Sequence, residues 1–225
     1  MLYPERLPAP ESWPDRLLGV AGFGLQRALR RRLRGGAALE AELRARVEAL
    51  RGQPLAARLA PLRYRLRREG LQRALVLDAC ALYCAALPDQ PLPAGEVLCA
   101  VLWLARGGVA ELASGAARAR ALELAAFARA LHDPPVHLLA VNERAARELA
   151  AALRPRLAAL GVEVGLVASG MDEAARRAAH AAPLVCASHR EVGLDYLRDR
   201  VLFGGAPGAL RNRCLLYTSD AADEL

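Results

Sequence analysis

From residue 94 onward the sequence alternates short apolar runs with longer amphipathic runs, and this alternation limits the possible fold more than any other feature. Short apolar runs are typical of buried strands, and runs with helical periodicity are typical of the helices between them. Such an alternation favours an α/β fold with a parallel sheet. The expected strands are residues 109–112, 136–141, 162–167 and 184–187, and the expected helices are residues 119–131, 143–160 and 172–181.

The expected helix over residues 143–160 has recognisable signals at its start and in its interior. Asn142 precedes it and has a side chain that can accept a hydrogen bond from the first-turn backbone. Glu143 adds a negative charge at the positive end of the helix dipole. Pro155 has no backbone N–H to donate, so we expect a kink or an earlier end at that point.

Residues 14–87 show helical patterning only. Residues 39–50 are strongly amphipathic, and residues 71–86 form a further helical stretch that ends before Pro88. Residues 88–93 contain three prolines, which cannot continue a helix, so we expect a linker there. The sequence therefore predicts an all-α N-terminal segment over residues 1–93, followed by the α/β part.

Positive charge is concentrated in the first third of the chain. The formal net charge is +7, with 16 arginines against 7 acidic residues in residues 1–75 and 15 against 17 in the remainder. A basic surface of this kind suits an anionic membrane surface, an acidic partner or nucleic acid, and a solvated helix face without a partner has the same composition. The arginine clusters are Arg30, Arg31, Arg32 and Arg34, and Arg63, Arg65, Arg67 and Arg68.

Cysteine and histidine spacing gives no metal-site pattern. The five cysteines include no C-x-x-C pair, and the four histidines have no H-E-x-x-H spacing. We therefore expect free thiols, surface histidines or hydrogen-bonded core histidines, and no metal site. No apolar segment follows the acidic start at Glu5, and the longest apolar run, residues 97–105, is about half the length of a membrane helix. These features predict a cytosolic protein with residues 97–105 in its core.

The last twelve residues, 214–225, differ in composition from the rest of the chain. They contain Thr218, the only threonine of the chain, and their sequence resembles a translated sequencing-adapter tail. This resemblance implies that residues 214–225 are not native and that the chain is a fragment of a longer protein. We therefore assign no function to them.

Residues 113–119 are the candidate phosphate-binding loop. In open parallel sheets, ligands bind beyond the carboxyl ends of the strands, and this segment of small residues follows the first expected strand and precedes a helix. Backbone N–H groups and a helix N-terminus in such a place can hold an anion. A tight turn without a ligand has the same composition. The candidate residues are Ser114, Gly115, Ala116, Ala117, Arg118 and Ala119.

Several segments resemble SecA, the motor ATPase family of bacterial preprotein translocation. Residues 107–119, GGVAELASGAARA, resemble the family's G-x-I-A-E-M-x-T-G-E-G-K-T, and residues 136–146, VHLLAVNERAA, resemble V-H-V-V-T-V-N-D-Y-L-A. Residues 176–180, RRAAH, resemble R-R-x-A-Y, and residues 191–199, EVGLDYLRD, resemble E-x-G-F-D-Y-L-R-D. With further likeness in residues 39–50 and 160–165, the resemblance covers most of residues 37–202.

The resemblance implies a P-loop NTPase-like, DEAD-like motor fold, with residues 94–213 as an incomplete first half of the motor domain. It also implies ATP with Mg²⁺ as cofactor, a translocon and unfolded preprotein as partners, and a place on the cytoplasmic face of the membrane. In the family, the segment that matches residues 191–199 is chiefly structural. We therefore expect Asp195, Arg198 and Asp199 to be scaffold, and neither His180 nor His189 to be catalytic.

The nucleotide-contacting positions depart from the family pattern. Residues 117–119 are Ala-Arg-Ala where the family has G-K-T, so the phosphate-bridging lysine and the Mg²⁺-binding hydroxyl are both missing. Val97 falls where the family has an adenine-binding glutamine, and no D-E-x-D precedes the tail. We therefore expect weak or absent nucleotide binding, no catalytic residue and no ATP hydrolysis by this chain.

Three hypotheses of function follow. The first is a fragment of a divergent SecA-like translocase whose parent links ATP to protein export. The second is a pseudo-ATPase that keeps the fold as an interaction module for a dedicated export partner. The third is a helicase-like nucleic-acid motor, but the V-N-E-R-A-A and D-Y-L-R-D segments match the protein-translocating branch more closely and argue against nucleic acid as a partner.

Overall fold

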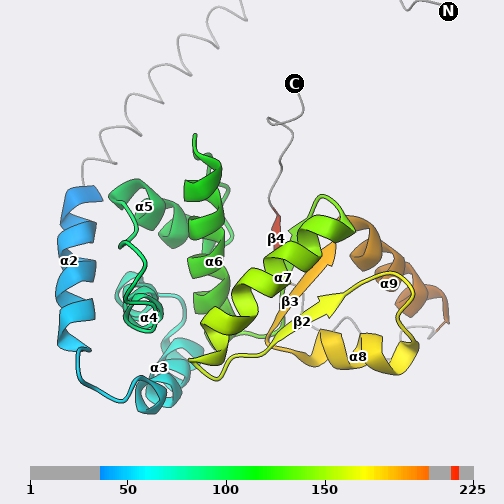
Figure 1. Cartoon of the computed structure of the whole chain (residues 1–225), viewed down its shortest axis with the longest axis horizontal. Helices are drawn as coiled ribbons and strands as arrows, with labels where there is room; N and C mark the ends of the chain where they lie inside the picture. The colour runs from blue at the N-terminus through cyan, green and yellow to red at the C-terminus, as the bar shows by residue number, and fades with distance from the viewer. Residues whose placement is uncertain (1–35, 203–213, 218–225) are drawn as a thin grey trace, which may run out of the picture.

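The computed structural model describes residues 36–202 and 214–217, with side chains described up to residue 198. Five helices precede the first strand within these residues, and helices then alternate with strands (Figure 1). The helices of the first part are α2 Gly36–Ala49, α3 Leu55–Glu69, α4 Arg73–Ala85, α5 Gly95–Leu104 and α6 Gly115–His132. Residues 14–35 and the cluster Arg30, Arg31, Arg32 and Arg34 lie outside the described residues.

The sheet has four parallel strands in the order β2-β3-β1-β4. The strands are β1 Val136–Ala140, β2 Val164–Val167, β3 Leu184–Ser188 and β4 Cys214–Tyr217. The helices that alternate with them are α7 Glu143–Ala158, α8 Glu173–Ala181 and α9 His189–Leu202. This arrangement confirms the expected parallel α/β fold with a helical segment before it.

The sheet is covered by helices on both faces, as its mostly buried strands require. One face packs against α6 and α7, and its core is continuous with the core of the helical part. The other face packs against α8 and α9 around a small separate apolar cluster. Fully buried side chains of the larger core include Leu43, Leu66, Leu98, Phe127, Leu138 and Leu153.

Helix signals in the sequence correspond closely to the observed helices. The amphipathic residues 39–50 lie in α2 and the stretch 71–86 in α4, and residues 88–93 form the irregular linker that the prolines predicted. Asn142 caps α7, accepting a 2.8 Å hydrogen bond from Ala145 N at Oδ1. Of the two effects expected of Pro155, a kink or an earlier end, the earlier end is wrong, because α7 continues to Ala158. Buried Leu153 and Leu157 hold this last turn against the core.

The strand predicted over residues 109–112 does not form, and the sheet begins only at Val136. Backbone N–H groups of Gly107 and Gly108 instead close the end of α5 on Leu104 O and Trp103 O, both at 3.0 Å. Gly107 has φ +83°, which a residue with a side chain rarely adopts. Ala110 and Leu112 pack partly against the main core, but the run pairs with no strand of the described residues, and Val109 remains 91% exposed.

A buried carboxylate joins the helical part to the sheet. Glu123 of α6 accepts hydrogen bonds from the Tyr83 hydroxyl of α4, from Arg120 at 3.1 Å and from Arg156 of α7 at 2.8 Å. Burial, with the nearby Glu123 charge, raises the pKa of Tyr83. Arg120 also lies over the Tyr83 ring, 5.3 Å from its centroid. Glu123 thereby connects α4, α6 and α7 through hydrogen bonds.

Candidate functional site

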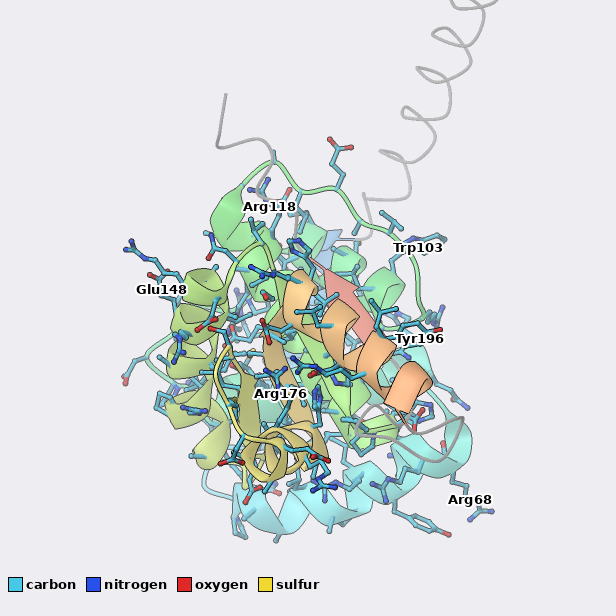
Figure 2. All side chains as sticks on the ribbon, turned by 90° about the vertical axis from the view of Figure 1, so that its right-hand side faces the viewer. Arg68, Trp103, Arg118, Glu148, Arg176 and Tyr196 are labelled. Carbon is cyan, nitrogen blue, oxygen red and sulfur yellow. The ribbon has the colours of Figure 1, made fainter. Side chains whose placement is uncertain are left out.

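The carboxyl edge of the sheet is the place where a ligand of this fold class would bind. Because all strands are parallel, their carboxyl ends lie at one edge, and the N-termini of α6 and α7 point to the same end (Figure 1). Figure 2 shows Arg118, in the first turn of α6, at this end of the molecule and Arg68 of α3 at the opposite end. The candidate phosphate-binding residues therefore lie at the expected edge, although no strand precedes them.

Residues 115–119 form the first turn of α6 and not an open loop. Ser114 is the N-cap, and its Oγ accepts a 3.5 Å hydrogen bond from Ala117 N. Ser114 O accepts the N–H of Arg118 at 2.9 Å, so this backbone amide is already engaged in the helix. Ser114, Gly115, Ala116 and Ala119 are exposed, and Ala117 and Arg118 are half-buried. The backbone N–H groups of Ala117 and Arg118 are thus both engaged within the helix.

These residues do not fit a magnesium nucleotide of the family's kind. Ser114 carries the only hydroxyl of residues 113–119, and it serves as the cap of α6. Ala119 presents a methyl group where a metal-binding hydroxyl is needed. Among the described residues, no group of three or more His, Cys, Asp or Glu side chains could hold a metal ion. Arg118 supplies charge for a phosphate but no ligand for Mg²⁺.

Val97 lies away from this turn, in the interior of α5. Its side chain is only 4% exposed and belongs to the main core with Leu98 and Val101. An apolar side chain in this position offers an adenine ring no hydrogen bond. The structure thus brings Ser114 to Ala119 together in one helical turn and leaves Val97 outside it.

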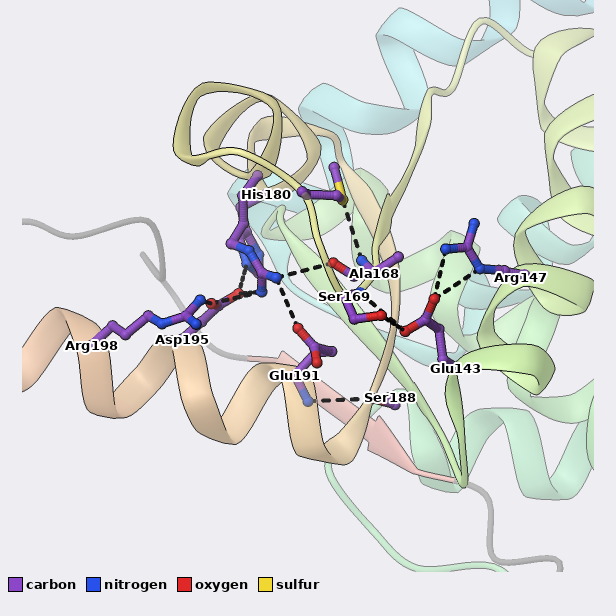
Figure 3. A network of polar contacts seen from close by, with 11 residues as sticks. Glu143, Arg147, Ala168, Ser169, His180, Ser188, Glu191, Asp195 and Arg198 are labelled. Atoms are coloured by element: carbon purple, nitrogen blue, oxygen red, sulfur yellow. Dashed lines mark hydrogen bonds and ion pairs between the residues drawn. The ribbon is translucent and has the colours of Figure 1, made fainter.

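The sequence did not predict a contact between Glu143 and Ser169 at the carboxyl edge. Glu143 at the start of α7 accepts hydrogen bonds from Ser169 N at 3.0 Å and Ser169 Oγ at 2.5 Å, and from Arg147 Nη2 at 2.6 Å (Figure 3). The hydrogen bonds from Ser169 lower the pKa of Glu143 to about 2. This contact fixes the segment after β2 to α7. The sequence placed Glu143 at the helix start but held no signal for Ser169.

A buried polar network fills the layer beneath α8 and α9 (Figure 3). Arg176 of α8 donates to both carboxylate oxygens of Asp195 at 2.8 and 2.9 Å, to Glu191 at 2.8 Å and to Ala168 O at 3.0 Å. Burial raises the pKa of Asp195, but hydrogen bonds from His180 and Arg176 outweigh burial and hold it below its usual value. Arg198 adds a weaker contact of 3.5 Å to Asp195.

In this network Asp195 and Arg198 contact other protein side chains, as the expected scaffold role requires. The side chain of Asp199 lies outside the described residues. His180 and His137 are buried and hydrogen-bonded, and His189 is exposed at the start of α9. His132 Nδ1 contacts Leu66 O at 2.8 Å. The prediction of surface or hydrogen-bonded core histidines is therefore confirmed.

The cysteines and a cavity among α2, α3 and α4 lie outside the candidate turn. Cys80, Cys84, Cys99 and Cys186 are free thiols, and burial raises the pKa of Cys186 to about 12.

A cavity of about 340 Å³ among α2, α3 and α4 is lined by Arg46, Arg65 and Asp78. Its charges are largely paired, because Arg46 binds Glu42 and Asp78 while Arg65 binds Glu69. None of the helices that the structure describes is long and apolar enough to span a bilayer.

The parallel sheet, the helices on both its faces and the helix N-termini at its carboxyl edge define a P-loop NTPase-like fold. The model of the SecA DEAD-like domain matches residues 26–218, and the chain therefore belongs to this family. The matched range includes β4 within the segment that composition marks as foreign.

Named translocase subunits are similar to this chain over most of its length or over about half of it. Protein translocase subunit SecA 2 of Nitrosospira multiformis is 33% identical over 213 residues, which are 88% of this chain and 31% of that protein. SecA 2 of Thermobifida fusca is 41% identical over 109 residues, 48% of this chain and 14% of that protein. SecA of Rickettsia akari is 36% identical over 110 residues, 49% of this chain and 12% of that protein. The chain thus spans less than a third of the length of these relatives.

Proposed function

We propose that this chain is a fragment of a SecA-like protein translocase subunit whose parent takes part in ATP-linked protein export across the cytoplasmic membrane. The observation that carries this proposal is the family match over residues 26–218. Identity of 33% with a named translocase subunit over 88% of the chain supports it. The relatives cited above are translocase subunits, which supports this function over a helicase-like one.

In this proposal the chain divides as its sequence patterning suggests. Residues 1–93 are the helical N-terminal segment, residues 94–213 the first half of the nucleotide-binding motor domain, and residues 214–225 a non-native tail. Residues 214–217 nevertheless lie beside β1 as the edge strand β4, where a further strand of the parent would continue the sheet. Such a strand is what an incomplete parallel sheet lacks.

In this proposal the chain supplies part of the motor fold and binds phosphate weakly. When ATP and Mg²⁺ are bound in the family, they supply the phosphoryl chemistry of the motor. Here Ser114, Gly115, Ala116, Ala117, Arg118 and Ala119 would at most hold a phosphate loosely, through Arg118 and the N-terminus of α6. The closed helical turn at these residues is the observation that favours the second candidate, a pseudo-ATPase interaction module for an export partner.

The proposed partners are a translocon, unfolded preprotein and an anionic membrane surface, with the protein peripheral on the cytoplasmic membrane. The membrane contact would use Arg30, Arg31 and Arg32 together with the apolar positions around them. Arginine heads beside apolar residues suit the boundary between lipid headgroups and acyl chains.

Sedimentation of the full chain with vesicles tests the proposal. Three vesicle types are compared: neutral lipid, anionic lipid, and anionic lipid with reconstituted translocon. We expect more chain on anionic than on neutral vesicles, and at least several-fold more again when the translocon is present. An Arg30→Gln, Arg31→Gln, Arg32→Gln variant should lose the lipid-dependent part only. Equal binding to anionic vesicles with and without translocon would contradict the proposed function.

A further inference from the structure

A buried chain of three side chains joins β1 to α8 and α9. His137 Nε2 lies 3.1 Å from His180 Nδ1, and His180 Nε2 lies 2.8 Å from Asp195 Oδ2. The three residues are 0%, 2% and 3% exposed. One strand and both helices of this sheet face are therefore connected through side chains that water does not reach.

The hydrogen bonds among these three side chains all run in one direction. Arg176 holds the Asp195 carboxylate ionised, so Asp195 only accepts and His180 must donate to it through Nε2. A neutral His180 then accepts at Nδ1, and His137 donates to it through Nε2. Nδ1 of His137 is left as a buried lone pair, and it has no hydrogen-bond partner.

Nδ1 of His137 has no hydrogen-bond acceptor, and only the charge of Asp195 favours a proton on this ring, against burial and the neighbouring His180. The register partners of His137 in the sheet are Val185 on β3 and Leu215 on β4, neither of which titrates. The ionisable groups that act on the His137 ring are His180, which is hydrogen-bonded to it, and Asp195, whose carboxylate is already bound to Arg176 and His180. The charged and titratable groups of the network to which these two belong are His180 and Arg176 on α8, and Glu191, Asp195 and Arg198 on α9.

We propose that His137 is the sensor of an acid-sensitive latch that holds α8 and α9 on β1. A proton on Nδ1 creates a buried N–H without an acceptor and a positive charge that burial disfavours. Both costs are relieved when α8 and α9 separate from β1 and water reaches the ring. The latch is closed while His137 is neutral and opens on acidification.

The pH window of the latch follows from the two states of His137. Burial and the neighbouring His180 lower its pKa to about 4 in the folded protein, from the ordinary value of 6.5. The stabilisation is therefore complete above pH 6.5 and is lost as the pH falls from there to about 4. The pKa of Asp195 is lowered below 3.8, so its contribution is lost at lower pH than that of His137.

The test compares the full chain with two variants, His137→Gln and His189→Gln. Glutamine at position 137 can still donate to His180 but cannot take up a proton, and His189 is an exposed control at the start of α9. Between pH 6.5 and 5, the unfolding equilibrium constant should rise in total about fifteenfold more in the wild type than in His137→Gln. His189→Gln should keep the wild-type pH dependence. Equal pH dependence in the wild type and His137→Gln would overturn the proposal.

Two measurements on the wild type do not depend on a variant that folds. Hydrogen exchange, corrected for the intrinsic effect of pH, should show α8 and α9 losing protection between pH 7 and 5 while α4 keeps it. The ring protons of His137 should show no titration near pH 6.5 while the protein is folded. Simultaneous loss of protection in α4 and α8, or a titration midpoint of His137 near 6.5 in the folded protein, would contradict the latch.

Discussion

The first turn of α6 and the layer beneath α8 and α9 both come from segments that resemble the same family, yet their side chains differ in what they can do. The turn offers one hydroxyl and one guanidinium, and most of its residues are exposed. The layer buries Arg176, Glu191 and Asp195 and joins them by hydrogen bonds of 2.8 to 2.9 Å. This chain therefore has the family's architecture in one region but lacks the family's lysine and threonine side chains in the other.

The largest effect is expected from breaking the layer at its centre. Arg176→Met leaves Glu191 and Asp195 as buried carboxylates without a cation, which should cost about 3–5 kcal/mol of unfolding free energy. Arg177→Met is the matched control. Its ion pair with Glu173 lies between side chains that are 61% and 66% exposed, so its loss should cost about 0–1 kcal/mol. Urea unfolding at pH 7.5 measures both, and similar costs would show that the layer is not structural.

A second substitution tests whether the buried Glu123 carboxylate stabilises the fold as strongly as the Arg176 network does. Glu123→Gln keeps the shape and the contact with Tyr83 but removes the charge that pairs with Arg120 and Arg156. Because Arg156 is 35% exposed and can regain water, we expect a smaller loss of about 2 kcal/mol. Glu163→Gln, at an exposed position, should have almost no effect. If Glu123→Gln costs as much unfolding free energy as Arg176→Met, the difference in burial of the arginine partners does not determine how much each network stabilises the protein.

Periodicity and capping predicted much of the fold because they depend on residues close in sequence. The amphipathic run 39–50, the capping residue Asn142 and the three apolar runs from residue 136 onward all correspond to observed elements. The error at residues 109–112 has a physical cause. A run of four residues becomes a strand only where a neighbouring strand pairs with it, and the sequence does not say which neighbour is present.

The site was predictable in position but not in its contacts. The N-terminus of α6 lies at the carboxyl edge, as the place of residues 113–119 in the sequence indicated. The contact of Glu143 with Ser169 and that of His137 with His180 join residues 26 and 43 positions apart. Only the packing of α7 and α8 on the sheet brings these side chains together, so no local pattern could reveal them.

Restoring the phosphate loop tests whether the two regions are independent. In the wild type we expect ATP binding that is weak and does not depend on Mg²⁺. Ala117→Gly, Arg118→Lys and Ala119→Thr together should improve ATP affinity by about tenfold or less, equal to about 1.4 kcal/mol, without turnover. Calorimetry with and without Mg²⁺ measures this, and urea unfolding should show that the layer beneath α8 and α9 is unaffected. Tight Mg²⁺-dependent binding by the wild type would show that the turn has been misinterpreted.

The smallest expected effect is the difference in stability between two helix-cap variants at the carboxyl edge, at Asn142 and at Ser114. Asn142 Oδ1 accepts from Ala145 N at 2.8 Å, whereas Ser114 Oγ accepts from Ala117 N only at 3.5 Å. Asn142→Ala should therefore cost about 1 kcal/mol, and Ser114→Ala about 0.5 kcal/mol or less. Urea unfolding of the two variants gives the difference directly. If Ser114→Ala is the more costly change, the turn at residues 114–119 is held more firmly than its geometry indicates, and its poor phosphate chemistry then follows from side-chain identity alone.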